Sequence, residues 1–315
     1  MMTLVPLFSL ACQPEVSTTP DDTAAEQVVD CSTEITATWP LQDSTDAYWR
    51  TDIEFVLDEV DDTATVVADF AGTQSTRQDG KVIVFTPDEP LTPGESYSVA
   101  LDYCRGTPEL AFTVSDFGEP MDDTTDLMAT AWSLDLASAR FIDAEGLGDI
   151  VANFLQNALL LGVTEAGADS FTLAIAKTEG GEQDPCSRTT FFPTADFSES
   201  PYWELSGTDV VIAVNEVELH LSDMDVAGTF SSDGSAMAGV TFTVTGDARD
   251  AGDWLGVEAD VICELAEGIG APCEPCGDGE VYCGTVIASD LDATAVGEPI
   301  AIIEELDPSC VEEKK

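Results

Sequence analysis

The chain has 315 residues, of which 62 are Asp or Glu and only 10 are Lys or Arg, so its formal net charge is −52. Nucleic-acid binding depends on clustered Lys and Arg that neutralise phosphates, and adhesion to anionic lipid through a basic patch needs the same residues. The composition therefore excludes both modes of binding. Hydrophobic residues make up 44% of the chain, which is close to the globular norm, so we expect about two folded domains.

The first residues resemble a bacterial export signal. An uncharged apolar run over residues 3–11 ends in a small residue directly before Cys12. This arrangement resembles the end of a lipoprotein signal peptide, and the resemblance implies that residues 1–12 are the signal and lipobox region and that Cys12 is lipidated. The tripeptide of residues 9–11 is a permuted lipobox and no Lys or Arg precedes the run, departures that a start upstream of Met1 would explain. An ordinary secretory signal cleaved near a cysteine is the alternative.

Residues 13–30 contain Pro, Thr and acidic residues in place of periodic apolar ones. This composition is typical of a flexible, disordered tether. Gln13, rather than Asp, follows the lipidation site, which by analogy with Gram-negative sorting implies an outer-membrane destination. We therefore expect an exported protein in the outer membrane, the periplasm or at the cell surface, which meets the membrane through its lipid anchor alone.

Residues 31–117 carry short alternating strands separated by turn residues. Ile53, Phe55 and Leu57 alternate with other positions along one predicted strand, and residues 78–80 (QDG) and 93–94 (PG) supply turns. About six or seven such strands fit in this length, which is typical of an all-β sandwich of immunoglobulin size.

Four segments of this region resemble the bacterial Ig-like domains of the SbsA type, which occur in surface-layer and lipoprotein modules. The segments are residues 51–55 (TDIEF), 82–87 (VIVFTP), 90–99 (PLTPGESYSV) and 110–114 (LAFTV). The resemblance covers roughly a quarter of the chain and implies a structural or spacer module without catalytic residues. Cys31 and Cys104 lie at the two ends of the region, where a disulfide would join the first strand to the penultimate one; the family usually lacks cysteine.

After an acidic linker over residues 118–130, the pattern changes in residues 131–310, and residues 311–315 form a tail. Apolar residues at helical spacing predict one helix over residues 146–157 and a second that ends at Gly268. Strands are expected at residues 159–163, 171–177, 210–221 and 281–288, with a hairpin around residues 232–234. The fold class is therefore mainly β: an Ig-like β-sandwich followed by an α+β domain with an antiparallel sheet and two helices on one face.

A polar, Pro-rich loop is expected to carry a group of aromatic residues, which are Phe191, Phe192, Phe197, Tyr202 and Trp203.

Nine cysteines in an exported chain indicate covalent cross-links. Cys12 is left over when the other eight pair, and six of these eight lie in the second domain: Cys186, Cys263, Cys273, Cys276, Cys283 and Cys310. Residues 273–276 have the two-residue gap of a zinc knuckle, and the same motif can act as a redox dithiol. We favour a disulfide cluster that clamps the second helix to the late strand, with the pairing left open.

The single histidine, His220, lies on a predicted strand, on the face opposite to that of Leu219 and Leu221. It is most simply a solvated side chain. Nucleophilic catalysis of the serine–histidine kind would have to use this one residue. No Gly-rich phosphate loop is present, and no acidic run completes an EF-hand. The close acid pairs are Asp122/Asp123, Asp223/Asp225 and Asp290/Asp292. We therefore expect no catalytic, cofactor or dedicated metal site, and weak cation binding by the acidic surface.

The leading hypothesis is a non-enzymatic, lipid-anchored surface or periplasmic protein, in which an Ig-like spacer presents a disulfide-stabilised domain to an unknown protein or envelope component. The alternative is a carrier of a hydrophobic ligand, which requires a continuous apolar pocket in the second domain. A carboxylate-based hydrolase ranks last, because it requires two acids that face each other about 5–10 Å apart across a cleft.

Overall fold

The computed structural model describes residues 31–122, 126–136, 139–143, 158–214, 217–269, 271–306 and 310. Within them the chain is mainly β with antiparallel sheets, as the sequence predicts, and its two described α-helices both lie in the region of the second predicted helix. Cys12, the predicted tether over residues 13–30 and the predicted helix over residues 146–157 lie outside the described residues.

The N-terminal part, residues 33–115, contains two antiparallel sheets. Its strands are β1 (Ile35–Trp39), β2 (Ile53–Leu57), β3 (Thr65–Ala68), β4 (Gly72–Arg77), β5 (Val82–Pro87), β6 (Ser96–Asp102) and β7 (Glu109–Thr113), with the 3-10 turn η1 (Gln78–Gly80) before β5. The sheet orders are β1-β2-β5-β4 and β3-β6-β7. Phe55 and Phe85 from the first sheet share one buried core with Leu101 and Phe112 from the second.

The outer face of the four-stranded sheet is also buried. Ile53 and Ile83 point into the shared core, whereas the alternating residues Glu54, Val82 and Val84 point away from it and are still only 3% exposed. An antiparallel sheet at a domain surface normally has one solvated face. This sheet is therefore covered on both sides, and the C-terminal part supplies the second cover.

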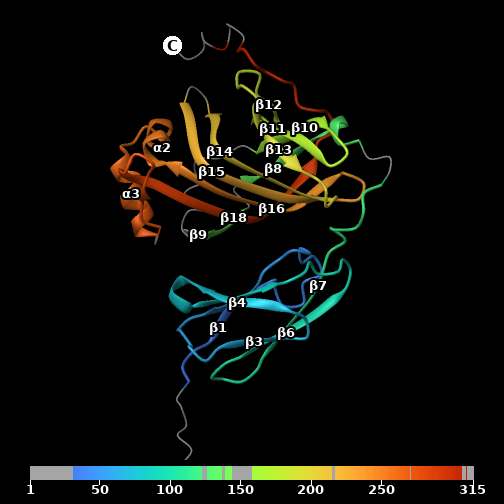
Figure 1. Cartoon of the computed structure of the whole chain (residues 1–315), viewed down its shortest axis with the longest axis vertical. Coiled ribbons are helices and arrows are strands. Elements are labelled where there is room, and N and C mark those ends of the chain that lie inside the picture. The colour runs from blue at the N-terminus through green and yellow to red at the C-terminus, as the bar shows by residue number, and fades with distance from the viewer. Residues whose placement is uncertain are drawn as a thin grey trace, which may run out of the picture. The chain divides into compact units, whose positions relative to one another are not determined.

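The C-terminal part, residues 126–310, is built on a closed barrel (Figure 1). Its elements are η2 (Leu127–Ala129), β8 (Ala131–Leu134), β9 (Arg140–Asp143), β10 (Leu159–Ala166), β11 (Ser170–Glu179), β12 (Glu182–Gln183), β13 (Thr190–Asp196), β14 (Tyr202–Val214), β15 (Val217–Phe230), β16 (Ala236–Asp247), α2 (Ala248–Leu255), α3 (Ala259–Gly268), β17 (Glu274–Pro275) and β18 (Val281–Ala295).

The barrel follows chain order. Strands β8, β10, β11, β13, β14, β15, β16 and β18 each pair antiparallel with the next, and β18 pairs with β8 to close the ring of eight. The short strands β9, β12 and β17 attach to β18 and β11. The sequence predicts an antiparallel sheet, which is confirmed, but it does not predict that the sheet closes on itself. Closure leaves no free edge around the ring.

Aromatic side chains pack inside the barrel. Phe171, Phe197 and Phe230 lie with ring centroids 5.3–5.9 Å apart, and Trp132 and Trp203, each 0% exposed, pack against Phe230 at 5.3 and 6.2 Å. Edge-to-face packing of this kind stabilises a core beyond the area it buries. The predicted aromatic loop is therefore wrong, because Trp203 belongs to β14 and Phe197 directly follows β13.

The sequence predicts the turn between β15 and β16 correctly but misses the break between β14 and β15. The predicted turn at residues 232–234 is confirmed: Gly234 has φ +73°, and the Asp233 carboxylate accepts hydrogen bonds from Ser231 and Ser235, which lower the pKa of Asp233 to about 2. The single strand predicted over residues 210–221 is wrong, because β14 ends at 214 and β15 begins at 217. The two strands pair antiparallel, which places Val210 opposite Leu221, and Val211 is 42% exposed.

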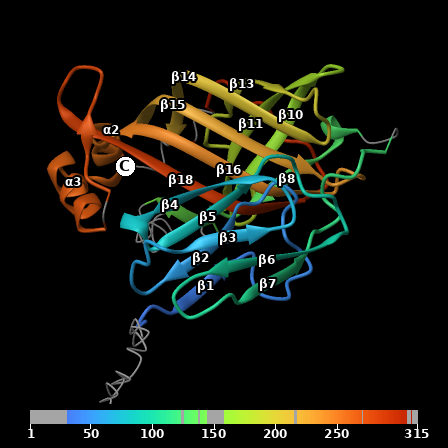
Figure 2. The ribbon, with the colours of Figure 1, turned by 60° about the horizontal axis from the view of Figure 1, so that its bottom comes forward.

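The second predicted helix divides into α2 and α3. Gly256 adopts a left-handed conformation, with φ +71°, that ends α2, and α3 ends at Gly268 as the sequence predicts. Figures 1 and 2 show both helices together at one end of the barrel, where α2 contacts β15, β16 and β18. Among the described helices, none has the length and apolar character needed to cross a bilayer.

Candidate functional site

The most heavily charged buried contact joins the N-terminal part to the barrel, and we call it the junction: Glu54, Arg77, Arg140 and Asp290. The side chain of Glu54, on β2, is 4% exposed. Arg140, on β9, donates to both carboxylate oxygens of Glu54 at 2.9 and 2.8 Å, and its Nε donates to Asp290 at 2.9 Å. Arg77, on β4, forms a second ion pair with Glu54. The junction is therefore a continuous chain of alternating charges.

The electrostatics of the junction favour its ionised form. Burial opposes ionisation of Glu54, but the hydrogen bonds from Arg140 and the charges of Arg140 and Arg77 outweigh it and hold the pKa of Glu54 below its usual value. Burial also disfavours the Arg140 cation, and its bonds to Glu54 and Asp290 reverse that effect, so the pKa of Arg140 is raised. The guanidinium lies 4.6 Å from the Trp39 ring centroid, within range of a cation–π contact.

A second contact lies at Thr229, which is 0% exposed. The hydroxyl groups of Tyr48 and Thr229 are 2.6 Å apart, and the indole N–H of Trp49 donates to the Thr229 oxygen at 3.0 Å. The Tyr48 ring covers Gly239, where a Cβ atom would lie 2.5 Å from three ring carbons. Burial raises the pKa of Tyr48 to about 12. Shape and hydrogen bonding therefore both fix the loop of residues 46–50 against the barrel.

Arg50 completes this contact. Its guanidinium carbon lies 3.8 Å from the Tyr202 ring centroid and 4.6 Å from that of Trp49, and its Nη2 donates to Glu199 at 2.5 Å. Arg50, Arg77 and Arg140 are three of only 10 basic residues in the chain. Scarce positive charge is thus concentrated where the N-terminal part meets the barrel.

Disulfides fix the C-terminal part, as the sequence predicts. The bonds are Cys186–Cys310, Cys263–Cys273 and Cys276–Cys283. The first joins Cys310 to Cys186, and nearby in sequence Thr189 and Gln183 hydrogen-bond to the backbone of residues 301–303. The second and third close short loops beside β17 and β18, so they hold α3 to the late strand only through the intervening segment. Cys31 and Cys104 are disulfide-bonded as well, and their mutual pairing stays a prediction.

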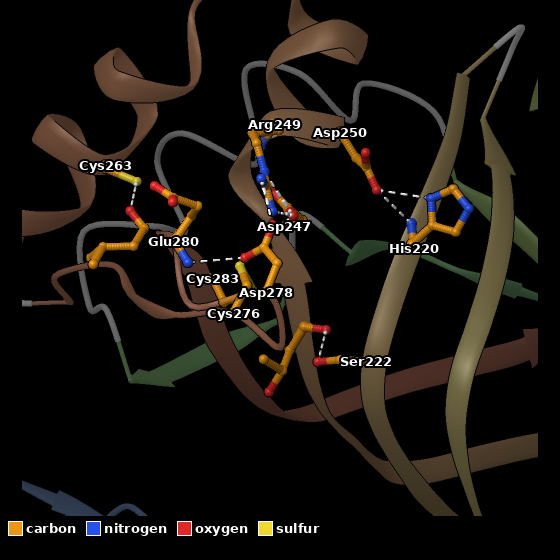
Figure 3. A network of polar contacts seen from close by, with 12 residues as sticks. His220, Ser222, Asp247, Arg249, Asp250, Cys263, Cys276, Asp278, Glu280 and Cys283 are labelled. Atoms are coloured by element: carbon orange, nitrogen blue, oxygen red, sulfur yellow. Dashed lines mark hydrogen bonds and ion pairs between the residues drawn. A yellow bond between two sulfur atoms is a disulfide. The ribbon is translucent and has the colours of Figure 1, made fainter.

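Figure 3 shows a polar network at the helical end of the barrel. Asp247 caps α2 by accepting the backbone N–H of Arg249 at 2.8 Å, and the Arg249 side chain binds both Asp247 and Asp278. Ligand-type atoms of Asp247, Cys276 and Cys283 lie within 4.8 Å of one another. Metal binding by cysteine requires thiolates. Because these two sulfurs are bonded to each other and Arg249 occupies the carboxylate, the group does not fit a metal ion.

His220 lies on the outer face of β15, as predicted, and its side chain is 60% exposed. Asp250 on α2 accepts the backbone N–H of His220 and lies 3.0 Å from its Nδ1 (Figure 3). The hydroxyl of nearby Ser222 donates to the Thr245 carbonyl. Within the part of the chain that the structure describes, no hydroxyl or thiol hydrogen-bonds to His220, so the geometry of a nucleophile and its base is not formed there.

The predicted acid pairs, Asp123 excepted, lie on strands or in loops of the described chain. Asp290 is bound to Arg140 and Ser289, and Asp225 accepts the Ser206 hydroxyl. Burial, with the nearby charges of Asp290 and Asp46, raises the pKa of Asp292. Asp123 lies outside the described residues.

Among the described residues, two cavities are lined by neither His220 nor the predicted acid pairs. One of about 520 Å³ lies beside β4 and the loop of residues 60–64. One of about 140 Å³ lies at Arg50 and Tyr202 with three acidic residues, Asp196, Glu199 and Glu204.

The junction residues were not identified from the sequence. One signal was present, because Glu54 is the only charged residue in an otherwise apolar strand (IEFVL). A charged side chain in such a strand is buried only with a partner. The partner, Arg140, is 86 residues away in the chain, and sequence spacing does not connect them.

Comparisons with known proteins return little. No protein-family model and no curated protein matches the chain. Among solved structures, the chain is similar to the one titled "Crystal structure of the S-layer protein rSbsC(31-844)", with 9% sequence identity and a TM-score of 0.20 over 86% of this chain. The match spans about half, 54%, of that protein's chain.

Proposed function

We propose that the protein is a non-enzymatic, exported and lipid-anchored component of the cell envelope, in which an Ig-like spacer rigidly presents the barrel to an envelope partner. The observation that carries this proposal is the junction. Arg140 and Glu54 form a buried bidentate pair between the two parts, and the loop of residues 46–50 adds a second anchor. Two separated contacts oppose hinge motion between the two parts. A spacer that holds another domain in a fixed position needs such a rigid connection.

The Ig-like assignment rests on strand order. Constant-type immunoglobulin domains have strands A, B, E and D in one sheet and C, F and G in the other. Numbered along the chain, the orders β1-β2-β5-β4 and β3-β6-β7 correspond to that arrangement. Together with the sequence blocks at residues 82–87 and 90–99, this order supports a module of the SbsA type.

Export is supported by the cysteines. All eight described cysteines are disulfide-bonded, and structural disulfides persist in oxidising compartments. Cytosolic thiol systems would reduce such bonds in most proteins. The lipid anchor at Cys12 rests on the sequence pattern alone.

Cell fractionation tests the proposal. Wild-type protein should partition with membranes and into the detergent phase, and Cys12→Ala should release it, whereas Ser17→Ala in the tether should leave it bound. A thiol-reactive reagent should label none of the eight disulfide cysteines before reduction. Recovery of wild-type protein in the cytosolic fraction with reactive thiols would refute both export and anchoring.

The carrier remains the second candidate, because an eight-stranded meander barrel is wide enough to hold one small ligand. Inside this barrel, the indole N–H of Trp203 has no hydrogen-bond partner among the residues that the structure describes. The aromatic packing around Phe230 opposes this candidate, since it fills the interior at that level. A fluorescent fatty-acid probe separates the two. Saturable binding that Trp203→Phe weakens would favour the carrier, and no saturable binding would favour the spacer and presented domain.

A further inference from the structure

Strand β4 is a free sheet edge. It ends the order β1-β2-β5-β4, and among the described strands it pairs only with β5. The N–H of Asp88 donates to the Ala71 carbonyl, which sets the alternation: residues 71, 73, 75 and 77 direct their backbone groups toward β5. The N–H and C=O groups of Gly72, Gln74 and Thr76 therefore point away from the sheet.

This edge lacks the usual protection. Edge strands are commonly blunted by Pro, by Lys or by a covering segment. Residues 72–76 of β4 (GTQST) contain neither Pro nor Lys, and residues 73–76 are exposed to solvent. The neighbouring edge of β3 is covered, because the Gln74 side chain accepts the Val66 N–H at 2.7 Å and donates to the Ala64 carbonyl at 3.1 Å. Strand β4 is thus the open edge on this side.

A cavity of about 520 Å³ lies beside the same strand, and Gln74 and Thr76 line it. Its lining carries three carboxylates, those of Asp61, Asp62 and Asp79, and one cation, Arg77, whose charge is paired with Glu54. Asp61 is already engaged, because it accepts hydrogen bonds from Thr63 and from the Cys104 N–H. Asp62 and Asp79 make no hydrogen bond or ion pair within the described chain and remain available to a cation.

We propose that β4 and this cavity form a binding site for an extended peptide that carries a Lys or Arg side chain. The peptide backbone pairs with the outward groups of Gly72, Gln74 and Thr76, and the basic side chain enters the cavity. Addition of a strand to a sheet edge obtains affinity from main-chain hydrogen bonds and specificity from pockets for alternate side chains. The proposal goes beyond a spacer role, since it gives the spacer a ligand of its own.

Charge selects this occupant over a second copy of the chain. A cationic side chain can place its head near Asp62 and Asp79 and lay its methylene stem on Val60, which is 44% exposed. Two copies that each carry a net charge of −52 repel each other. A basic extended segment gains both the strand pairing and the attraction.

The test uses the folded chain and three capped peptides of about seven residues, slightly longer than β4. The first alternates Thr and Val around a central Lys, the second has Glu at the centre, and the third is the Lys peptide with alternate backbone amides N-methylated. Calorimetry measures affinity, and the amide NMR signals of Gly72 and Thr76 report the location. The Lys peptide should bind, and the Glu and N-methylated peptides should each bind about tenfold more weakly or worse.

Two variants extend the test. Thr76→Pro removes an outward N–H without breaking the pairing with β5, because proline is tolerated where the N–H of an edge strand faces solvent. Asp79→Asn removes one carboxylate of the cavity, and Asp223→Asn removes one exposed carboxylate of the barrel as the matched control. We expect about tenfold weaker binding for the first two variants and no change for the control.

Three results would overturn the proposal. One is no binding of the Lys peptide at millimolar concentration. Another is equal binding of the N-methylated peptide, or equal weakening by Asp223→Asn, which would mean general attraction to an acidic surface. The third is self-association in sedimentation that Thr76→Pro abolishes, which would make a second copy the occupant.

Discussion

Arg140 holds the carboxylate of Glu54 with two hydrogen bonds, at 2.9 and 2.8 Å, although the two residues belong to separately packed parts of the chain. A bidentate arginine–carboxylate pair fixes orientation as well as distance. When one partner of a buried pair is removed, the other is left as an uncompensated buried charge. The stability of the whole unit therefore depends on this contact.

The first prediction concerns the pair itself. Arg140→Met should lower the free energy of unfolding by about 2–4 kcal/mol, because Glu54 keeps only Arg77 as its cationic partner. The double variant Glu54→Leu/Arg140→Met should recover part of that loss, since it removes both charges. Chemical denaturation measures each value. Arg105→Met, in the exposed pair with Glu34, is the control and should change stability by less than about 1 kcal/mol. Equal effects of Arg140→Met and Arg105→Met would contradict a special role for the junction.

The second prediction follows from the pKa of Glu54, which is lowered in the folded chain from its usual value of 4.5. A lowered folded-state pKa means that ionised Glu54 stabilises the fold fully above the unfolded pKa, and that this contribution disappears as the pH falls through the folded pKa. Denaturation curves between about pH 6 and pH 3 should therefore show a steeper loss of stability for wild type than for Glu54→Gln. Parallel pH profiles would show that Glu54 is not held in its ionised form.

The third prediction concerns Gly239. Its φ is +58°, and an added methyl group would lie 2.5 Å from carbons of the Tyr48 ring, so there is no room for a side chain. Gly239→Ala should lower the free energy of unfolding by about 2–4 kcal/mol through overpacking and backbone strain. Gly180→Ala, at a φ of +62° where nothing lies within 4 Å, is the matched control. In a Tyr48→Ala background the Gly239→Ala effect should shrink, and an undiminished effect would attribute the loss to backbone strain alone.

The fourth prediction concerns the net charge of −52. Repulsion among carboxylates opposes the compact state, and salt shortens its range to about 8 Å at physiological ionic strength. The midpoint of thermal unfolding should rise when salt or a divalent cation is added, whereas an uncharged solute at equal osmolarity should produce a smaller rise. Constant midpoints from low to high salt would show that the acidic residues are spaced widely enough not to affect stability.

Local features of the fold could be predicted from the sequence because local chemistry determines them. The turn at Asp233 and the end of α3 at Gly268 depend on residues within a few positions of each other. Closure of the barrel does not, because it pairs residues 132–134 of β8 with residues 293–295 of β18. The alternation of apolar residues is the same in an open sheet and in a closed one.

The junction was missed for a related reason. Alternation predicts that Glu54 points away from the core of its own sheet, and this is correct. A residue that points away from one core is normally solvated, and only the approach of β9 makes it buried. Likewise, the apolar alternation over residues 210–221 is unbroken, and it gives no sign that one strand ends at 214 and the next begins at 217.

The central claim is that the chain is an exported, cross-linked and lipid-anchored scaffold. Intact-mass spectrometry of the native protein, before and after reduction, tests it most directly. The account predicts a mature chain that begins at an acylated Cys12 and gains eight hydrogens on reduction, as four disulfides require. An unacylated chain that retains residues 1–11 and shows no mass change on reduction would contradict it.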